Sequence, residues 1–104
     1  MIRELIKVSM YINEADEWHH GPLHLEVLKM LEEQGLSGGT VLHAIAGYTA
    51  KGGIHTTSLV DAGGKLPLVI EFIDTQEKVR MVLPRLKEMA PHRLVVRQSV
   101  ITDE

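Results

Sequence analysis

Apolar and polar side chains alternate along the segment from Leu5 to Ile12. Every second residue there is apolar: Ile6, Val8, Met10 and Ile12. The segments LPLVIEFID (66–74) and RLVVRQSVI (93–101) repeat the alternation and are rich in branched side chains. A period of two indicates a β-strand with one buried face, so the pattern predicts three strands. In the middle one, Leu68, Ile70 and Phe72 share a face.

A helical spacing of apolar residues follows Pro22. Pro22 suits the first turn of a helix, and Gly35 suits its end. Between them the apolar residues recur every three or four positions: Leu23, Val27, Met30 and Leu31. The pattern predicts a first helix.

A second helix is predicted after the strand at 66–74. Asp74 and Glu77 resemble a capping box, in which side chains satisfy the free N–H groups of the first turn. The residues expected to be buried are Val79, Val82, Leu83 and Leu86. Pro84 lies within this stretch and predicts a kink, because proline lacks the backbone donor.

A further strand is predicted from Thr40 to Tyr48, because small residues flank it and Val41, Leu42 and Ile45 favour extended structure. The resulting order is that of the ferredoxin-like fold. We therefore predict an α+β fold, ferredoxin-like β-α-β-β-α-β, with a four-stranded antiparallel sheet and two helices on one face.

The other face of the predicted sheet has no helix to cover it. Alternation assigns to it the apolar residues Leu5, Tyr11, Val69, Ile73, Val95 and Ile101. Such a face is too apolar to lie in water, so we expect something to cover it. With the first strand central, Lys7 would lie between Glu71 and Arg97. This charged stripe either pairs internally or reaches a ligand.

Length and composition fit one globular domain covering residues 1–104. Apolar residues make up 44% of the chain, and no apolar run approaches the roughly 20 residues of a membrane span. A net charge of −3 with scattered basic residues argues against nucleic acid as a partner. The chain has no cysteine, and its first residues lack the pattern of a secretory signal. We expect a cytoplasmic protein without membrane insertion.

The segment from Tyr48 to Lys65 is long for a connection between antiparallel strands. It has 18 residues, whereas about two to five suffice. Its glycines allow backbone N–H groups to converge on an anion, and Lys51 offers a positive charge. The Walker pattern GxxxxGK[ST] is missing, however, and no helix follows the glycines. Two interpretations stay open: a ligand-binding loop and an ordinary connection.

The segment WHHGPLH carries His19, His20 and His24, and neutral imidazoles bind zinc or copper. The intervening Gly-Pro pair places His20 before the helix, so it cannot share a helix face with His24. We assign no metal site, and metal binding by these three histidines stays open. Ser58 lacks the nucleophile-elbow pattern GxSxG, and no local base accompanies it, so we expect no enzyme.

Four stretches carry a resemblance to a known family: GYTAKGGIHTTS (47–58), KLPLVIEFID (65–74), WHHGPL and GLSGGTV. Over nearly the whole chain they resemble the PII-like family called domain of unknown function 190. A more distant similarity runs to the PII signal-transduction proteins. Their corresponding loop also has a Lys-Gly pair and a His-Thr pair, here Lys51-Gly52 and His55-Thr56.

The resemblance implies a PII-like regulatory protein: a homotrimer with inward-facing sheets that cover the bare face. It implies effector clefts between subunits at the base of the 48–65 segment, which would contact a target protein. No cofactor is implied beyond a possible adenine nucleotide as effector. The ligand-binding residues implied are Gly47, Tyr48, Lys51, Gly52, Gly53, His55, Thr56 and Arg97.

The sequence departs from the PII proteins in two places. The connection APHR (90–93) is too short to hold their phosphate-binding loop, and the 48–65 segment has no tyrosine near its tip. The alternative function is a divalent-metal-binding trimer of the cation-tolerance type. That family uses the same fold and trimer, and this chain has six histidines.

Overall fold

The fold is taken from a computed structural model, which describes residues 1–48, 55–56 and 66–104. Of residues 55–56 only the backbone is described. The main sheet and the helices consist of β1 (Ile2–Asn13), α1 (Leu23–Glu33), β4 (Thr40–His43), β7 (Pro67–Asp74), α2 (Gln76–Met89) and β8 (Leu94–Asp103). Two short hairpins accompany them, β2 (Glu17–Trp18) with β3 (Gly21–Pro22) and β5 (Ala46–Gly47) with β6 (His55–Thr56).

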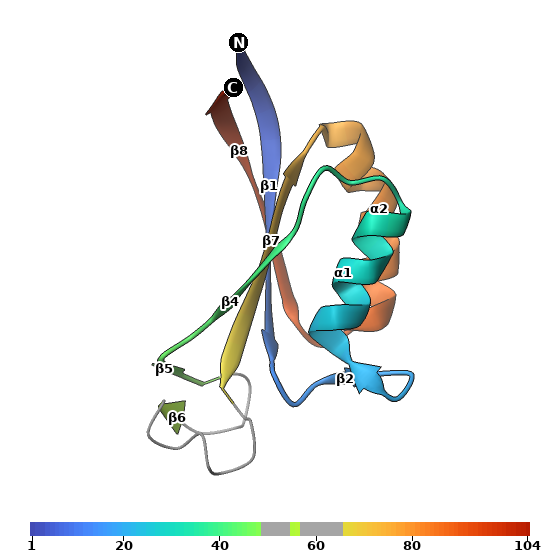
Figure 1. The fold of residues 1–104 in the computed structure, drawn as a ribbon, viewed down its shortest axis with the longest axis vertical. Coiled ribbons are helices and arrows are strands. Elements are labelled where there is room, and N and C mark those ends of the chain that lie inside the picture. The colour runs from blue at the N-terminus through green and yellow to red at the C-terminus, as the bar shows by residue number, and fades with distance from the viewer. Residues whose placement is uncertain (49–54, 57–65) are drawn as a thin grey trace.

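The main sheet has the strand order β4-β7-β1-β8, with every neighbouring pair antiparallel. Both helices lie on one face of this sheet (Figure 1). The predicted ferredoxin-like α+β fold is therefore confirmed. Among the described residues, no helix is long and apolar enough to cross a membrane.

The hydrophobic core lies between the sheet and the two helices. Residues of alternate parity in β1 and β7 face it, and Val8, Met10, Ile12 and Ile70 are fully buried. From the helices, Val27 and Leu86 pack into the same cluster. Each such side chain contributes about 1.5–3 kcal/mol relative to an exposed one. The alternation seen in the sequence thus identifies this face correctly.

The α1 helix ends at a glycine with positive φ, as the sequence predicted. Gly35 has φ +82°, and the Leu36 N–H donates to the Leu31 carbonyl at 3.0 Å. This arrangement is a Schellman motif, which favours glycine because other residues are strained at such angles. Lys78 of α2 donates from Nζ to the Gly35 carbonyl at 2.6 Å, so the end of α1 is tied to the start of α2.

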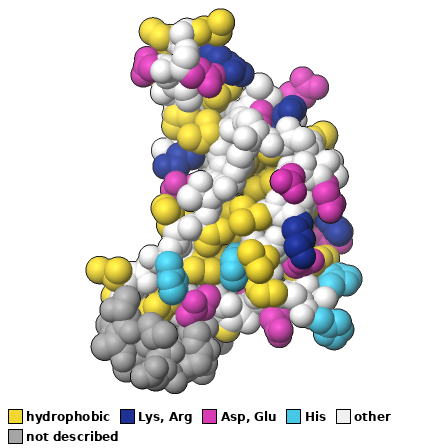
Figure 2. Space-filling view, in the orientation of Figure 1, with side chains coloured by type: hydrophobic (Ala, Val, Ile, Leu, Met, Phe, Trp, Pro, Cys, Tyr) yellow, Lys and Arg dark blue, Asp and Glu magenta, His cyan; other side chains and the backbone are white. Residues whose placement is uncertain are grey.

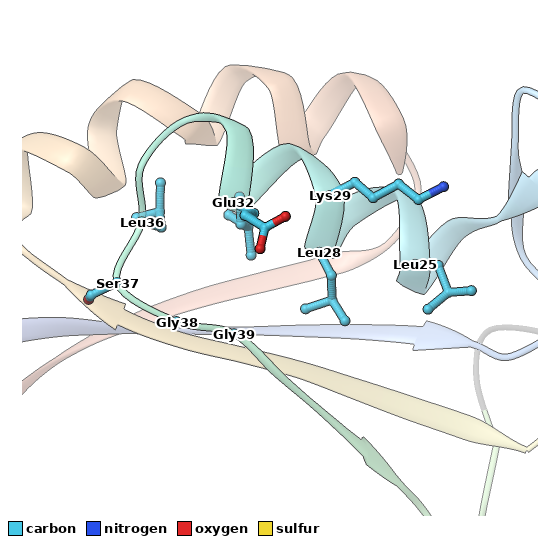
Figure 3. A pocket seen from close by; sticks show the side chains of 9 residues that line it. Leu25, Leu28, Lys29, Glu32, Leu36, Ser37, Gly38 and Gly39 are labelled. Carbon is cyan, nitrogen blue, oxygen red and sulfur yellow. The ribbon is translucent and has the colours of Figure 1, made fainter.

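The segment after α1 passes close to that helix on its way to β4. A Cβ on Gly39 would lie 3.0 Å from Leu28 Cδ2, so a larger residue would require the Leu28 side chain to shift. Figure 3 shows this passage and the hollow beside it. The hollow is lined by Leu25, Leu28, Lys29, Leu31, Glu32, Leu36, Ser37, Gly38 and Gly39.

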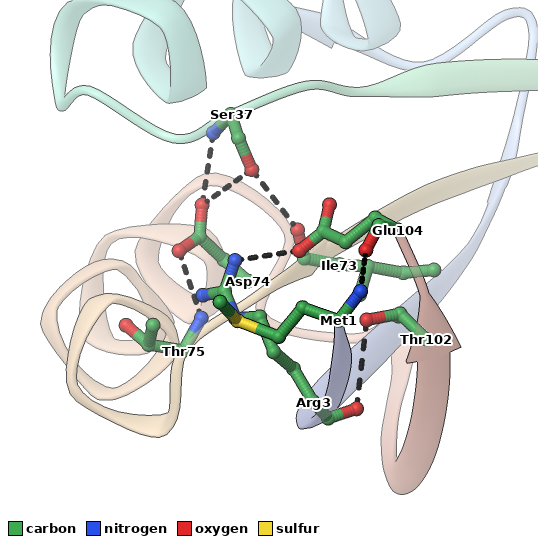
Figure 4. A network of polar contacts seen from close by, with 8 residues as sticks. All are labelled: Met1, Arg3, Ser37, Ile73, Asp74, Thr75, Thr102 and Glu104. Carbon is green, nitrogen blue, oxygen red and sulfur yellow. Dashed lines mark hydrogen bonds and ion pairs between the residues drawn. The ribbon is translucent and has the colours of Figure 1, made fainter.

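Asp74 joins β7, the start of α2 and the segment before β4 (Figure 4). Its Oδ2 accepts from the Ser37 backbone N–H at 2.8 Å and from the Ser37 hydroxyl at 2.9 Å, and its Oδ1 accepts from the Thr75 N–H at 2.8 Å. Burial by itself raises the pKa of Asp74. The hydrogen bonds from Ser37 and Thr75 and the nearby Lys78 charge outweigh burial and lower this pKa below its ordinary value.

The predicted cap of α2 is wrong by one residue. Thr75, not Asp74, is the N-cap, and its hydroxyl accepts from the Lys78 N–H at 3.3 Å. The Asp74 carboxylate is occupied by the contacts described above. Pro84 lies inside α2, which continues to Met89.

The predicted assignment of β8 side chains to the two sheet faces is wrong. Val95 pairs with the core residue Met10 and Arg97 pairs with Val8, so both face the helices. Ile101 pairs with Glu4 and shares that face. The uncovered face instead carries Leu94, Val96, Gln98 and Val100. A strand shifted by one residue exchanges its two faces. Residues 94–96 (LVV) are apolar at both odd and even positions, so alternation did not decide which of them face the helices.

The predicted strand over 40–48 is only partly correct. The strand β4 ends at His43, and residues 44–45 separate it from β5. Whereas β4 pairs with β7, β5 pairs with β6 outside the main sheet.

Candidate functional site

Several chain segments meet where the 48–65 segment leaves and rejoins the body of the protein. They are the end of β1, the end of β4, the hairpin strand β5 and the start of β7 (Figure 1). The Ala44 N–H donates to the Pro67 carbonyl at 3.1 Å, which continues the pairing between β4 and β7 beyond His43. We name this region the loop base and define it as residues 13–14, 43–48 and 66–67.

Glu14 is the residue that connects these segments. Its backbone N–H donates to the Leu66 carbonyl at 3.0 Å, and its Oε1 accepts from the Leu66 N–H at 3.2 Å. Its Oε2 lies 3.0 Å from Nε2 of His43. One carboxylate thus contacts both ends of the connection between β4 and β7.

Gly47 packs tightly against the start of β7. A Cβ at this position would lie 3.2 Å from Cγ of Pro67. Gly47 also pairs with His55, and Ala46 pairs with Thr56, in the β5–β6 hairpin. The absence of a side chain at Gly47 therefore lets β5 lie against β7.

The structure brings some of the predicted ligand-binding residues together. Gly47 and Tyr48 belong to the loop base, and the backbone of 55–56 is paired beside them. The Tyr48 side chain is 67% exposed, so it is available for contact. The predicted residues Lys51, Gly52 and Gly53 lie outside the described residues.

Arg97 lies elsewhere. It is an exposed residue of β8 on the helix-covered side of the sheet, in a hollow with Gln76 of α2 and Ser99. Its expected place beside Lys7 is taken by Gln98, the residue that pairs with Lys7. Arg97 therefore cannot complete a charged stripe on the uncovered face.

Sequence reasoning missed Glu14 and assigned His43 no specific role. Glu14 stands in a polar run after β1, and His43 stands in a segment predicted to be an ordinary strand. Their contact depends on how β1, β4 and β7 are arranged, which local pattern does not specify. Glu14 lies two residues after the predicted strand 5–12, and His43 lies within the predicted strand 40–48, so no local signal linked them.

The face of the sheet opposite the helices is apolar and exposed. By register it carries five of the exposed large apolar residues: Leu94 (62%), Leu42 (47%), Tyr11 (41%), Ile73 (38%) and Val96 (37%). In its middle, Nζ of Lys7 lies 3.3 Å from Oε2 of Glu71. Of the two alternatives left open for the charged stripe, the structure shows internal pairing for Lys7 and Glu71.

The histidines do not gather at one place in the part of the chain that is described. His19 and His20 form the turn of the β2–β3 hairpin, with positive φ values of 50° and 72°. Figure 2 shows histidine side chains at separate places on one face, with acidic and basic side chains interspersed. In the same part of the chain, no group of three or more His, Cys, Asp or Glu residues is arranged to hold a metal ion.

The fold and the loop base together define a class of ferredoxin-like proteins in which a long segment joins the second and third main strands. Residues 5–102 match the family DUF190, described as Uncharacterized ACR, COG1993. The chain belongs to this family, and the predicted resemblance is confirmed. A curated relative is the UPF0166 protein MJ1524 of Methanocaldococcus jannaschii, which is 29% identical over 96 residues covering 92% of this chain and 85% of that protein.

Solved structures share the fold at low sequence identity. CPII of Thiomonas intermedia K12, described as a nitrogen regulatory PII-like protein bound to ADP, AMP and bicarbonate, has a TM-score of 0.69 and 15% identity, covering 100% of this chain and 98% of that one. A protein of Thermus thermophilus, described as a putative PII-like signaling protein, has a TM-score of 0.63 and 22% identity, covering 97% and 89%. CutA of Synechococcus elongatus PCC7942 has a TM-score of 0.64 and 9% identity, covering 98% and 85%. These likenesses establish the fold.

Proposed function

We propose that this protein is a PII-like regulatory protein without enzymatic activity, which assembles as a homotrimer and binds an adenine nucleotide at clefts between subunits. The observation that carries the proposal is the uncovered apolar sheet face, which ends at the loop base. If copies of the chain cover this face, each loop base comes to lie beside a neighbouring subunit. A target protein would be contacted through the 48–65 segment.

The composition of the uncovered face supports self-association. Contiguous exposed apolar surface marks an interaction site in soluble proteins, and this face carries Tyr11, Leu42, Ile73, Leu94 and Val96. The Lys7–Glu71 pair in its middle has both side chains 29% exposed in the isolated chain. A single charge that is buried without its partner is costly, so Lys7 and Glu71 would stay paired when the face is covered.

The choice of an adenine nucleotide as effector rests on two points. The fold is shared with a PII-like protein solved with ADP and AMP. The segment that begins at the loop base also contains Lys51 and several glycines, which suit charge-assisted contacts to phosphate. We therefore expect the ligand to interact with Gly47, Tyr48, Lys51, Gly52, Gly53, His55 and Thr56. Arg97 remains a proposed contact only if a neighbouring subunit presents it.

The test is isothermal titration calorimetry of the purified protein with ADP, AMP and ATP. We expect saturable binding of at least one of them, and about tenfold weaker binding by Lys51→Ala, the scale of one charged hydrogen bond. Lys87→Ala, an exposed lysine near the end of α2, is the matched control. Absence of binding for all three nucleotides would refute the nucleotide part of the proposal. Equal loss in both variants would refute the assignment of Lys51.

A further inference from the structure

The contacts of Glu14 single it out among the residues of the loop base. It closes a pair of hydrogen bonds with Leu66, through its own N–H and through Oε1, at 3.0 and 3.2 Å. Its second carboxylate oxygen contacts His43 at 3.0 Å. The Glu14 side chain is 21% exposed and the His43 side chain is 51% exposed, so solvent reaches the imidazole.

The two partners of Glu14 stand at opposite ends of one connection. His43 is the last residue of β4, and Leu66 directly precedes β7. The distance between the ends of this connection is therefore fixed in part by one side chain. Leu66 is 1% exposed, which anchors its end in the protein interior. The end at His43 is held by its pairing with Leu68, by the Ala44 N–H bond to the Pro67 carbonyl and by the side-chain contact with Glu14.

We propose that Glu14 is a positioning residue for the loop base and that protonation of His43 makes this junction sensitive to pH. A protonated imidazole donates from both nitrogens and is attracted by the Glu14 carboxylate. A neutral imidazole carries one N–H, so only one of its two tautomers donates from Nε2. In the other tautomer two acceptors face each other and the contact is lost. The junction is therefore tighter when His43 is charged.

The surroundings of His43 leave Glu14 as its charged partner in the described part of the chain. On β7, His43 pairs with Leu68, and its neighbours on β4 and in the following segment are Leu42 and Ala44. Glu14 is also the one acidic residue within 4 Å of the imidazole among the described residues. The pH response is thus expected to disappear when Glu14 loses its charge.

A change at this junction reaches β5 through the chain. Gly47 follows His43 by four residues and lies against Pro67, the residue after Leu66. If the contact between His43 and Glu14 loosens, β5 is less strictly held against β7. Because the proposed effector site includes Gly47 and Tyr48, the loosening should weaken ligand binding. This last step rests on the proposed function, whereas the junction itself does not.

The junction is tested without ligand, by amide hydrogen exchange of Leu66 at pH 6 and pH 8. After correction for intrinsic exchange, we expect about two- to fivefold higher protection at pH 6 in the wild type, the scale of one exposed ion pair. Glu14→Gln and His43→Gln should abolish this difference, while His92→Gln, at an exposed histidine between α2 and β8, should retain it. The Ile70 amide at the sheet centre reports global stability. A pH response of equal size in Glu14→Gln, or none in the wild type, would refute the proposed pH sensitivity of the contact between Glu14 and His43.

The coupling to the effector site is tested by calorimetric titration with ADP at the same two pH values. ADP itself gains protons in this range, so the ratio of affinities at pH 6 and pH 8 is compared between proteins. We expect this ratio to be about two- to fivefold larger in the wild type than in Glu14→Gln or His43→Gln. Equal ratios would refute the coupling between the Glu14–His43 contact and ADP binding. The proposal about the contact itself would then be judged by the Leu66 exchange result alone. Failure of the wild type to bind ADP would remove both the coupling and the ADP form of the proposed function.

Discussion

Asp74→Asn should destabilise the protein by about 1.5–3 kcal/mol, the worth of one hydrogen bond to a charged group. The carboxylate accepts from three donors, two on Ser37 and one on Thr75, at 2.8–2.9 Å. An asparagine has one oxygen and one NH2 group, so its NH2 must face either Ser37 or the Thr75 N–H. At least one buried donor loses its acceptor, and a hydrogen bond to a charged group is worth about 1.5–3 kcal/mol. Asp74 is 6% exposed, so water cannot replace the lost acceptor easily.

The assay is urea unfolding of wild type and variant at equal protein concentration. Ser37→Ala is a graded control, because it removes the hydroxyl bond and keeps the backbone one, and should cost about 1 kcal/mol. Glu77→Gln, an exposed acidic residue in the first turn of α2, should cost about 0.3–1 kcal/mol through the helix dipole alone. Asp74→Asn within 0.5 kcal/mol of wild type would refute the reasoning.

The same variant has a defined pH dependence. The folded-state pKa of Asp74 is lowered, so the charged carboxylate contributes stability that is complete above its unfolded-state pKa, near the ordinary value of 3.8. That contribution is lost as the pH falls through the lower, folded-state pKa. The stability difference between wild type and Asp74→Asn should therefore be full at pH 7 and shrink as the pH falls below about 3.8. A difference that stays constant over this range would show that the charge of Asp74 is not involved.

Three further substitutions follow, two from the register of β8 and one from the residue that precedes it. Val96→Asp should dissociate the proposed trimer and leave the subunit folded. Val95→Asp should unfold the subunit, because Val95 packs against the core. Light scattering measures dissociation and circular dichroism measures unfolding, and dissociation by neither variant would contradict the inward-facing sheet. Arg93→Gln should lower the free energy of unfolding by about 1–3 kcal/mol, because Arg93 donates to both carboxylate oxygens of the part-buried Asp16 at 2.7 and 2.8 Å. An unchanged urea midpoint would show that this ion pair contributes nothing to stability.

Local patterns were sufficient for most of the fold. The period of two in β1 and β7 and the helical spacing in α1 and α2 identified the buried positions, because each pattern is repeated over several turns or residue pairs. The side chains of β8 could not be assigned to faces in the same way. Leu94, Val95 and Val96 are apolar at both parities, and the choice between them is made by pairing with β1, at the other end of the chain.

The candidate site was less accessible from sequence. The glycine-rich segment drew attention to Gly47 and Lys51, and the resemblance gave them a role. The contact between Glu14 and His43 left no local trace, because it forms between the ends of strands that are distant in sequence. The predicted position of Arg97 was wrong for the same reason as the predicted faces of β8. An error of one residue in register moves a side chain to the opposite side of the sheet.

The central claim is that copies of this chain form a trimer that binds adenine nucleotides, and native mass spectrometry with ADP tests both parts at once. The account predicts an ion of three chains, near three times 11.6 kDa, that gains up to three ADP molecules with increasing nucleotide. The Val96→Asp variant should give single chains that bind ADP weakly or not at all. A wild-type spectrum of single chains, or a trimer without bound ADP at any concentration, would contradict the account.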